Sequence, residues 1–177
     1  TLLAMTRPVH PADAGIGNEE IAALTTQDIR RQMCDVKAIT LLANVLLREQ
    51  AADAGAMEAI LVRDGLAVEG AASNLFIVQA GRIVTPPKSR FLLPGITRDL
   101  VLELAAEHVL PHLEAEIPAA ALQSADEIWL TSSSREVMPV TQLDGKPVAN
   151  GRPGPMWREM NRLFQEYKLR LRSGGAA

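Results

Sequence analysis

The chain has little cysteine, little net charge and no long apolar run, and each shortage excludes a class of protein. Its one cysteine, Cys34, cannot form an internal disulfide, and no CxxC spacing indicates a zinc site or a redox pair. A net charge of −3 gives no electrostatic reason to expect nucleic acid. No apolar run reaches membrane-spanning length, and the first residues lack the basic-then-apolar pattern of a signal peptide. We therefore expect a cytoplasmic protein that acts on small molecules, with no membrane or nucleic-acid partner.

The length and composition suit one domain. The 177 residues, 47% of them hydrophobic, are enough for one well-buried core, and there is no internal repeat. The first residue is not methionine, and the Pro-containing segment 1–15 is typical of a linker between domains. We expect a domain over residues 16–172, a disordered tail over 173–177, and a further domain upstream that this chain lacks.

Hydrophobic periodicity and turn residues predict helices and hairpins in irregular succession. The predicted helices cover residues 38 to about 55, 97–108, 119–124 and about 155–171. The predicted strands lie within 21–36 and at 57–62, 67–69, 74–78, 82–85, 126–131 and 137–143. Because helices and strands do not alternate as βαβ units, we predict an α+β fold rather than a doubly wound sheet. Lys37 is then expected at a strand-to-helix junction, at the rim of a sheet.

Lysine is scarce, with four residues against fourteen arginines. Three of the four lie among Pro, Gly and polar residues typical of surface turns, whereas Lys37 adjoins a long apolar segment. An amine that attacks an aldehyde must be unprotonated, and the pKa of a lysine is lowered at the edge of a water-poor pocket. Lys37 is therefore the candidate nucleophile. The alternative is a solvent-exposed lysine at the start of a helix.

Two further segments have groups suited to an anionic, aromatic ligand. Gly95-Ile96-Thr97 precedes a predicted helix, where unpaired N–H groups attract phosphate, and Ser132-Ser133-Ser134 offers hydroxyl and amide donors. Either segment alone could be an ordinary turn. Glu69 ends a strand beside the small residues 70–72, where its carboxylate could pair with a protonated ring nitrogen, or could face water from an edge strand.

Metal and thiol chemistry find no support in the sequence. His108 and His112 are four residues apart, but Pro111 interrupts the helix between them and no third ligand is evident, so we predict no metal site. No histidine lies near Cys34 in the sequence to activate its thiol, and we expect this residue to pack.

Together, Glu69-x-x-x-x-Asn74-Leu75-Phe76, Ile83-x-Thr85 and Leu93-x-Gly95-Ile96-x-Arg98 resemble the signature of the class IV (fold type IV) PLP-dependent aminotransferases. The resemblance extends over residues 7–167, nearly the whole chain. Within the family, segments 35–37, 131–140 and 143–145 are most similar to D-amino-acid (D-alanine) aminotransferases. The resemblance implies mixed sheets in a pseudo-barrel with packed helices, and a homodimer. It also implies pyridoxal 5′-phosphate as cofactor and ping-pong transamination between D-amino acids and 2-oxo acids.

The resemblance assigns roles by position. Lys37 would form the Schiff base with the cofactor and shuttle the proton to and from the substrate Cα. Glu69 would contact the pyridine nitrogen and keep the ring cationic, with Asn74 supporting the pocket. The remaining implied contacts are Leu93 on the ring face, Ile96, Thr97 and Ser133 at the phosphate, and Ser132 among the cofactor-binding residues.

The chain departs from the family in two places. Ala71 and Ala72 stand where D-amino-acid aminotransferases often have serines, so hydrogen bonds expected there are lost. The small N-terminal domain that helps to hold the phosphate and the substrate carboxylate is absent, so we expect the large cofactor-binding domain alone, with poor activity. The alternatives within the fold are a branched-chain aminotransferase, an (R)-amine transaminase and an aminodeoxychorismate lyase. The alternative of another class is a non-catalytic isolated domain.

Overall fold

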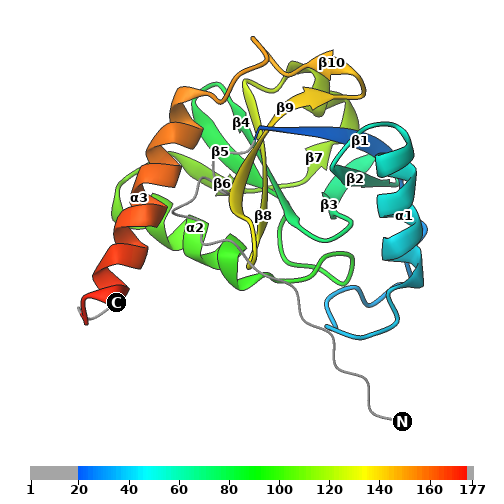
Figure 1. Ribbon diagram of the computed structural model, residues 1–177, viewed down its shortest axis with the longest axis horizontal. Helices are drawn as coiled ribbons and strands as arrows, with labels where there is room; N and C mark the ends of the chain where they lie inside the picture. Colours follow the sequence, from blue (N-terminus) through cyan, green and yellow to red (C-terminus); the bar gives the residue numbers. More distant parts are fainter. Residues whose placement is uncertain (1–19, 175–177) are drawn as a thin grey trace.

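The computed structural model describes residues 20–174, in which ten strands form a single mixed sheet with helices packed outside it (Figure 1). The elements in chain order are β1 (Ile21–Gln27), α1 (Leu42–Asp53), β2 (Glu58–Arg63), β3 (Leu66–Gly70), β4 (Asn74–Gln79), β5 (Arg82–Thr85), α2 (Ile96–Glu107), β6 (His112–Glu114), β7 (Ile117–Pro118), the 3₁₀ helix η3 (Ala119–Ser124), β8 (Glu127–Ser132), β9 (Glu136–Leu143), β10 (Lys146–Pro147) and α3 (Pro155–Arg172). The predicted linker at 1–15 and the tail beyond residue 174 lie outside the described residues.

The sheet runs in the order β6-β5-β4-β8-β9-β1-β2-β3-β7, and β10 pairs with β9. Strand β1 is parallel to both of its neighbours, and β5 is parallel to β6, while the other pairs are antiparallel. Tight turns at residues 64–65, 80–81 and 144–145 join consecutive strands, and both residues of each turn have positive φ. This backbone twist suits two-residue hairpins, and the Asp-Gly and Ala-Gly pairs at these positions tolerate it, so the predicted hairpins are confirmed.

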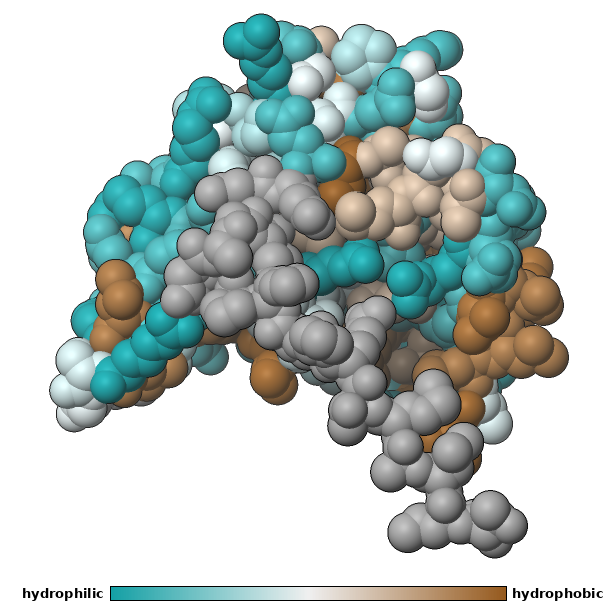
Figure 2. All heavy atoms as spheres, viewed as in Figure 1, coloured by the Kyte–Doolittle hydropathy of each residue, from teal (hydrophilic) through white to brown (hydrophobic). Residues whose placement is uncertain are grey.

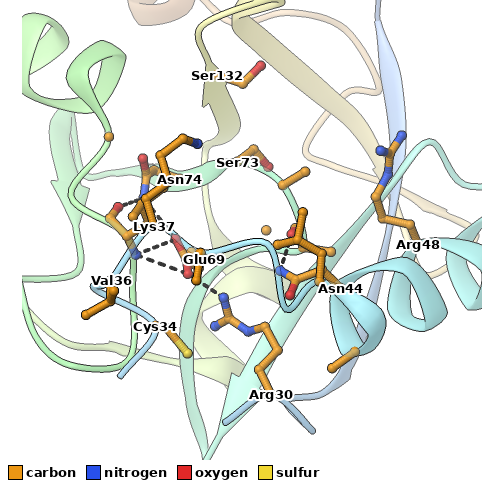
Figure 3. A pocket seen from close by; sticks show the side chains of 18 of the residues that line it. Arg30, Cys34, Val36, Lys37, Asn44, Arg48, Glu69, Ser73, Asn74 and Ser132 are labelled. Atoms are coloured by element: carbon orange, nitrogen blue, oxygen red, sulfur yellow. Dashed lines mark hydrogen bonds and ion pairs between the residues drawn. The ribbon is translucent and has the colours of Figure 1, made fainter. Parts of the chain in front are cut away.

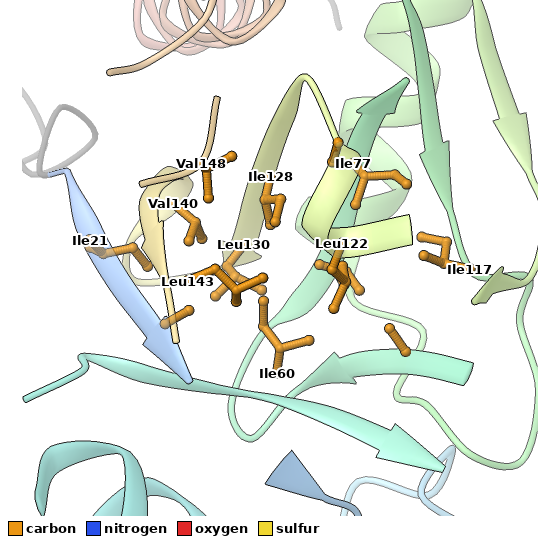
Figure 4. Close-up of a cluster of buried hydrophobic side chains, with 14 of the residues drawn as sticks. Ile21, Ile60, Ile77, Ile117, Leu122, Ile128, Leu130, Val140, Leu143 and Val148 are labelled. Carbon is orange, nitrogen blue, oxygen red and sulfur yellow. The ribbon is translucent and has the colours of Figure 1, made fainter. Parts of the chain in front are cut away.

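Alternate residues of each central strand enter different cores. Leu75 and Ile77 of β4 and Ile128 and Leu130 of β8 pack in a cluster that also includes Ile60 from β2 and Ile117 from β7 (Figure 4). Strands that are far apart in the sheet order can share one cluster only if the sheet curls around it. The predicted α+β fold with a curled, mixed sheet is therefore confirmed.

The opposite face of β4 and β8 packs against two helices. Phe76 and Trp129 lie with Val101 and Leu104 of α2 and with α3 residues Trp157, Met160 and Phe164 in a second buried cluster. A third cluster joins α1 to β2 and β3 through residues that include Leu47, Ala51 and Leu61. Figure 1 accordingly shows α1 at one end of the molecule and the pair α2 and α3 at the other.

The segment around Lys37 differs from the prediction. Strand β1 ends at Gln27, residues 28–41 form a loop, and α1 begins only at Leu42, so the expected strand-to-helix junction at Lys37 was wrong. The loop is held by contacts outside itself, including the Cys34 N–H donated to the Arg90 carbonyl at 2.7 Å. These contacts outweigh the helical preference of residues 38–41, which have no side-chain cap at Leu41.

Three short strands, β6, β7 and β10, were not predicted. Each has only two or three residues, too few for an alternating pattern, and β6 and β7 pair with strands that are distant in the sequence. The other predicted elements are present with ends shifted by a few residues, which is the ordinary scatter of helix and strand boundaries.

Candidate active site

One cavity of about 720 Å³ lies between the loop at 28–41, the start of α1, the β3–β4 connection, residues 93–97 and the end of β8. Its lining includes every residue that the sequence analysis assigned to a cofactor, namely Lys37, Glu69, Asn74, Leu93, Ile96, Thr97, Ser132 and Ser133. Figure 3 shows Lys37, Glu69, Asn74 and Ser132 around this hollow. The curled sheet thus gathers segments that are far apart in the chain.

Helix α2 points its first turn at the cavity. Gly95 caps the helix without a side-chain hydrogen bond, and the first N–H groups of any α-helix have no acceptor within it. A Cβ on Gly95 would lie 2.2 Å from the Asn74 side-chain oxygen, so only glycine allows β4 and the helix to approach this closely. Thr97 lies inside the first turn of α2 and is buried.

The end of β8 brings hydroxyl groups to the same place. Thr131 pairs with Asn74 across β4 and β8, and Ser132 and Ser133 follow it along the cavity wall. The Thr131 side chain is 1% exposed, and its hydroxyl has no hydrogen-bond partner within residues 20–174. A buried hydroxyl without a partner is unfavourable. The cavity therefore has a cluster of donors suited to the oxygens of an anion.

Glu69 is a buried carboxyl group in the wall of the same cavity. It is 4% exposed, which excludes the alternative of an edge-strand glutamate in water. Its carboxylate accepts hydrogen bonds from Arg30 Nη1 at 2.5 Å, from Asn74 Nδ2 at 3.1 Å and from the Leu93 N–H at 3.1 Å. Burial raises the pKa of Glu69 to about 7, although the nearby Arg30 guanidinium opposes this effect.

Arg30 joins Glu69 to a second buried acid. Its guanidinium donates to both oxygens of Asp28 at 2.9 and 3.0 Å and to the Phe91 carbonyl at 3.0 Å. Arg63 donates to the same Asp28 carboxylate at 2.9 Å and stacks over the Phe91 ring. Burial opposes both charges, yet these contacts lower the pKa of Asp28 and raise that of Arg30. The two groups are therefore ionised.

Lys37 lines the mouth of the cavity and is exposed. The water-poor setting expected for this lysine is thus not provided by residues 20–174. A hydrogen bond within its loop runs from Arg31 to the Val36 carbonyl at 3.1 Å. The backbone turns at Met33, which has a φ of 72°. The loop therefore has a defined shape around the lysine.

Sequence reasoning missed several residues of the cavity, including Arg30, Asn44, Arg48 and Ser73. Asn44 donates from α1 to the Ala71 carbonyl at 2.7 Å, which ties the helix to the β3–β4 connection. No local pattern marks these residues, since each belongs to the cavity only through the packing of α1 and β1 against β2 and β3.

Exposed apolar side chains gather on α1 and the loop before it, and several of them also line the cavity. Figure 2 shows a brown area over this part of the molecule. Ile39 is 96% exposed and Leu42 72%. Ile96, at the start of α2, is 76% exposed. We call the exposed members of this set the apolar rim; they are Val36, Ile39, Leu41, Leu42, Val45, Leu46 and Ile96.

Comparison with known proteins defines the family. Residues 1–143 match the family model described as amino-transferase class IV, so the chain belongs to the class IV aminotransferases. The D-alanine aminotransferase of Bacillus licheniformis is 40% identical over 149 residues, which cover 84% of this chain and 53% of that protein. The chain spans about half the length of the curated relatives it matches.

Solved structures agree with the fold. The branched-chain amino acid aminotransferase of Escherichia coli matches with a TM-score of 0.77 and 31% identity over 82% of this chain and 50% of that chain. The branched-chain enzyme of Thermobaculum terrenum in its PLP form has a TM-score of 0.83 and 26% identity, over 91% of this chain and 54% of that chain. The resemblance stated from the motifs is confirmed. Within the described residues, no helix has both the length and the apolar character needed to span a bilayer.

Proposed function

We propose that this chain is the cofactor-binding part of a pyridoxal 5′-phosphate-dependent transaminase that exchanges amino and oxo groups between D-alanine-like amino acids and 2-oxo acids. The observation that carries the proposal is that Lys37, Glu69 and the first turn of α2 line one cavity. Relatives about 40% identical to the chain are D-alanine aminotransferases, which supports D-amino acids as substrates.

The residues present fit this cofactor. The cavity has the size of small-molecule sites in general. The unpaired Thr131 hydroxyl and the N–H groups at Gly95–Thr97 suit a phosphate. Glu69 accepts from three donor groups, of which the Leu93 N–H is shared between both oxygens, and its carboxylate lines the cavity, where it can also accept from a protonated ring nitrogen. An anion site and a buried acid in one cavity match the two ends of the cofactor.

When bound, the cofactor supplies an aldehyde that takes the amino group and a cationic ring that accepts the electrons released at the substrate Cα. Lys37 Nζ would bond to that aldehyde between turnovers and would accept and return the Cα proton. Glu69 would hold the ring nitrogen in its protonated form, and Leu93 would pack on the ring face. Ile96, Thr97, Ser132 and Ser133 would surround the phosphate, with Asn74 fixing Glu69 from behind.

We also propose that a second copy of the chain covers the apolar rim. Exposed apolar side chains such as Ile39 and Leu42 gather on α1 and the loop before it, and exposed apolar patches mark interaction sites in soluble proteins. A partner there would exclude water from Lys37. Light scattering should then show a dimer that Leu42→Glu weakens and that Leu169→Glu, at an exposed position of α3, leaves intact. A strictly monomeric wild-type chain at high concentration would contradict this.

The cytoplasmic location stays a prediction.

Turnover assays test the activity. The full-length protein should transaminate D-alanine, not L-alanine, with 2-oxoglutarate. The 177 residues alone should have very little activity. Lys37→Ala should lower the rate at least about a hundredfold, because it removes the general base. Lys146→Ala, at an exposed position of β10, is the control. Unchanged turnover in Lys37→Ala would refute the assignment.

A second candidate is a branched-chain aminotransferase, because the two solved structures described above are branched-chain enzymes. Preference for L-leucine over D-alanine in the same assay would favour it. Release of pyruvate from aminodeoxychorismate would instead identify a lyase.

A further inference from the structure

Four buried charged side chains form a row that ends in the cavity. Arg63 contacts Asp28 at 2.9 Å, Asp28 contacts Arg30 at 2.9 Å, and Arg30 contacts Glu69 at 2.5 Å. The side chains are between 0% and 13% exposed. The row therefore alternates positive and negative charge through the interior, from β2 to the cavity wall.

The Arg30 guanidinium binds Asp28 and Glu69 through different nitrogens. Its Nε and Nη2 groups bind Asp28 and the Phe91 carbonyl, and its Nη1 group binds Glu69. A fork held on one edge by a carboxylate and a carbonyl has little freedom to rotate. The Nη1 group is thus fixed on one oxygen of Glu69.

The charges of the row sum to zero only when Glu69 is ionised. Asp28 already has two cationic partners, so it does not compensate Arg30 alone. A neutral Glu69 would leave an uncompensated positive charge in the interior, which is unfavourable. Burial of Glu69 acts in the other direction, since it favours the neutral acid. Arg30 is the charged group in direct contact that opposes this effect.

We infer that Arg30 is a positioning residue, which favours the ionised form of Glu69 against the effect of burial and orients the carboxylate so that it accepts a hydrogen bond from the cofactor's ring nitrogen. The inference rests on the proposed function. Without Arg30, a neutral Glu69 would offer a proton to that nitrogen rather than accept one, and the ring would lose its cationic form. The ring nitrogen is not the atom with which Lys37 would react, so the roles of Arg30 and Lys37 can be tested separately.

Other charged groups near Glu69 come from the row itself and from the cavity lining, where Lys37 and Arg48 lie. Asp28 and Arg63 belong to the row, and Asn74 and the Leu93 N–H are neutral donors. Cys34, in the loop at 28–41, is close enough to Arg30 and Glu69 for their charges to act on its thiol, and burial raises the pKa of this thiol. A probe on the ring nitrogen itself avoids confusion with thiol ionisation.

The test compares the holoprotein with Arg30→Gln, Arg30→Lys and the control Arg82→Gln, an exposed residue at the start of β5. The readouts are the dissociation constant of pyridoxal 5′-phosphate and the ¹⁵N shift of ring-labelled cofactor between pH 6 and 9. We expect a protonated ring nitrogen in the wild type and in Arg82→Gln. Arg30→Gln should show a deprotonated nitrogen and a dissociation constant at least about tenfold higher, as expected for loss of one partner of a buried charge pair.

Arg30→Lys keeps the charge without the fork, so its dissociation constant should lie between those of the wild type and Arg30→Gln. If Arg30→Gln does not fold by circular dichroism, Arg30→Lys decides the matter, and wild-type values in that variant overturn the inference. Wild-type values in a folded Arg30→Gln overturn it as well. If the wild type binds the cofactor and the Arg30 variants behave like it, the inference fails but the proposed function stands. A wild type that binds no cofactor overturns both.

Discussion

Glu69→Gln is expected to flatten the pH dependence of stability of the cofactor-free chain between about pH 4.5 and 7. In the folded chain burial raises the pKa of Glu69 from its ordinary 4.5 to about 7. Between these values the folded state keeps a proton that the unfolded state releases. The stabilisation is therefore fully present below pH 4.5 and is lost as the pH rises through about 7.

The magnitude follows from the two pKa values. Each pH unit between them is worth about 1.4 kcal/mol, so Glu69 contributes a fall of about 3 kcal/mol over the interval. Glutamine has no proton to exchange and should lose this slope. Burial also raises the pKa of Glu58, but that residue titrates in both proteins and cancels in the comparison.

Urea unfolding of the cofactor-free wild type and Glu69→Gln at several pH values measures the effect. The variant should be offset by the loss of a hydrogen-bond acceptor, since Asn74 Nδ2 and Arg30 both donate to the carboxylate. The slope, not the offset, is the test. Equal slopes in the two proteins between pH 4.5 and 7 would refute the reasoning.

Gly95→Ala and Thr131→Val test the packing at the end of the cavity formed by α2 and β8, and Thr85→Val serves as the comparison for Thr131→Val. Alanine at position 95 suits the backbone φ of −73°, but its Cβ would displace the Asn74 amide. Urea unfolding of Gly95→Ala should therefore show a loss of about 1–3 kcal/mol in the free energy of unfolding. An unchanged midpoint would contradict the close approach of Gly95 and Asn74. Thr131→Val removes a hydroxyl that has no hydrogen-bond partner among residues 20–174, so stability should be unchanged or slightly higher. Thr85→Val, which loses a 2.6 Å bond to the Leu75 carbonyl, should cost about 1 kcal/mol, and the reverse order would be inconsistent with the structure.

Local patterns in the sequence predicted the longer strands and the turns between them, and the family resemblance grouped the residues that line the cavity. Strands β4 and β8 alternate between two cores, and the turns that follow β2, β4 and β9 have residues suited to positive φ. The segments at Glu69, 93–97 and 132–133 lie next to such elements and line one cavity, while their roles toward a cofactor stay predictions.

Other features depend on tertiary packing that no local pattern encodes. The loop before α1 takes its shape from bonds such as the one between Cys34 and Arg90, so helical spacing alone placed the start of the helix too early. Arg30 reaches Glu69 only because β1, β2 and β3 lie side by side in the sheet. The exposure of Lys37 likewise depends on what covers the apolar rim, which the sequence does not specify.

Borohydride reduction of the cofactor-loaded protein tests the central claim most directly, because it fixes the cofactor to the amine that binds it. Peptide mass mapping should find the pyridoxyl group on the peptide that contains Lys37, and Lys37→Ala should abolish it. A pyridoxyl group on Lys88, Lys146 or Lys168 instead, or cofactor-loaded protein with no adduct at Lys37, would contradict the account.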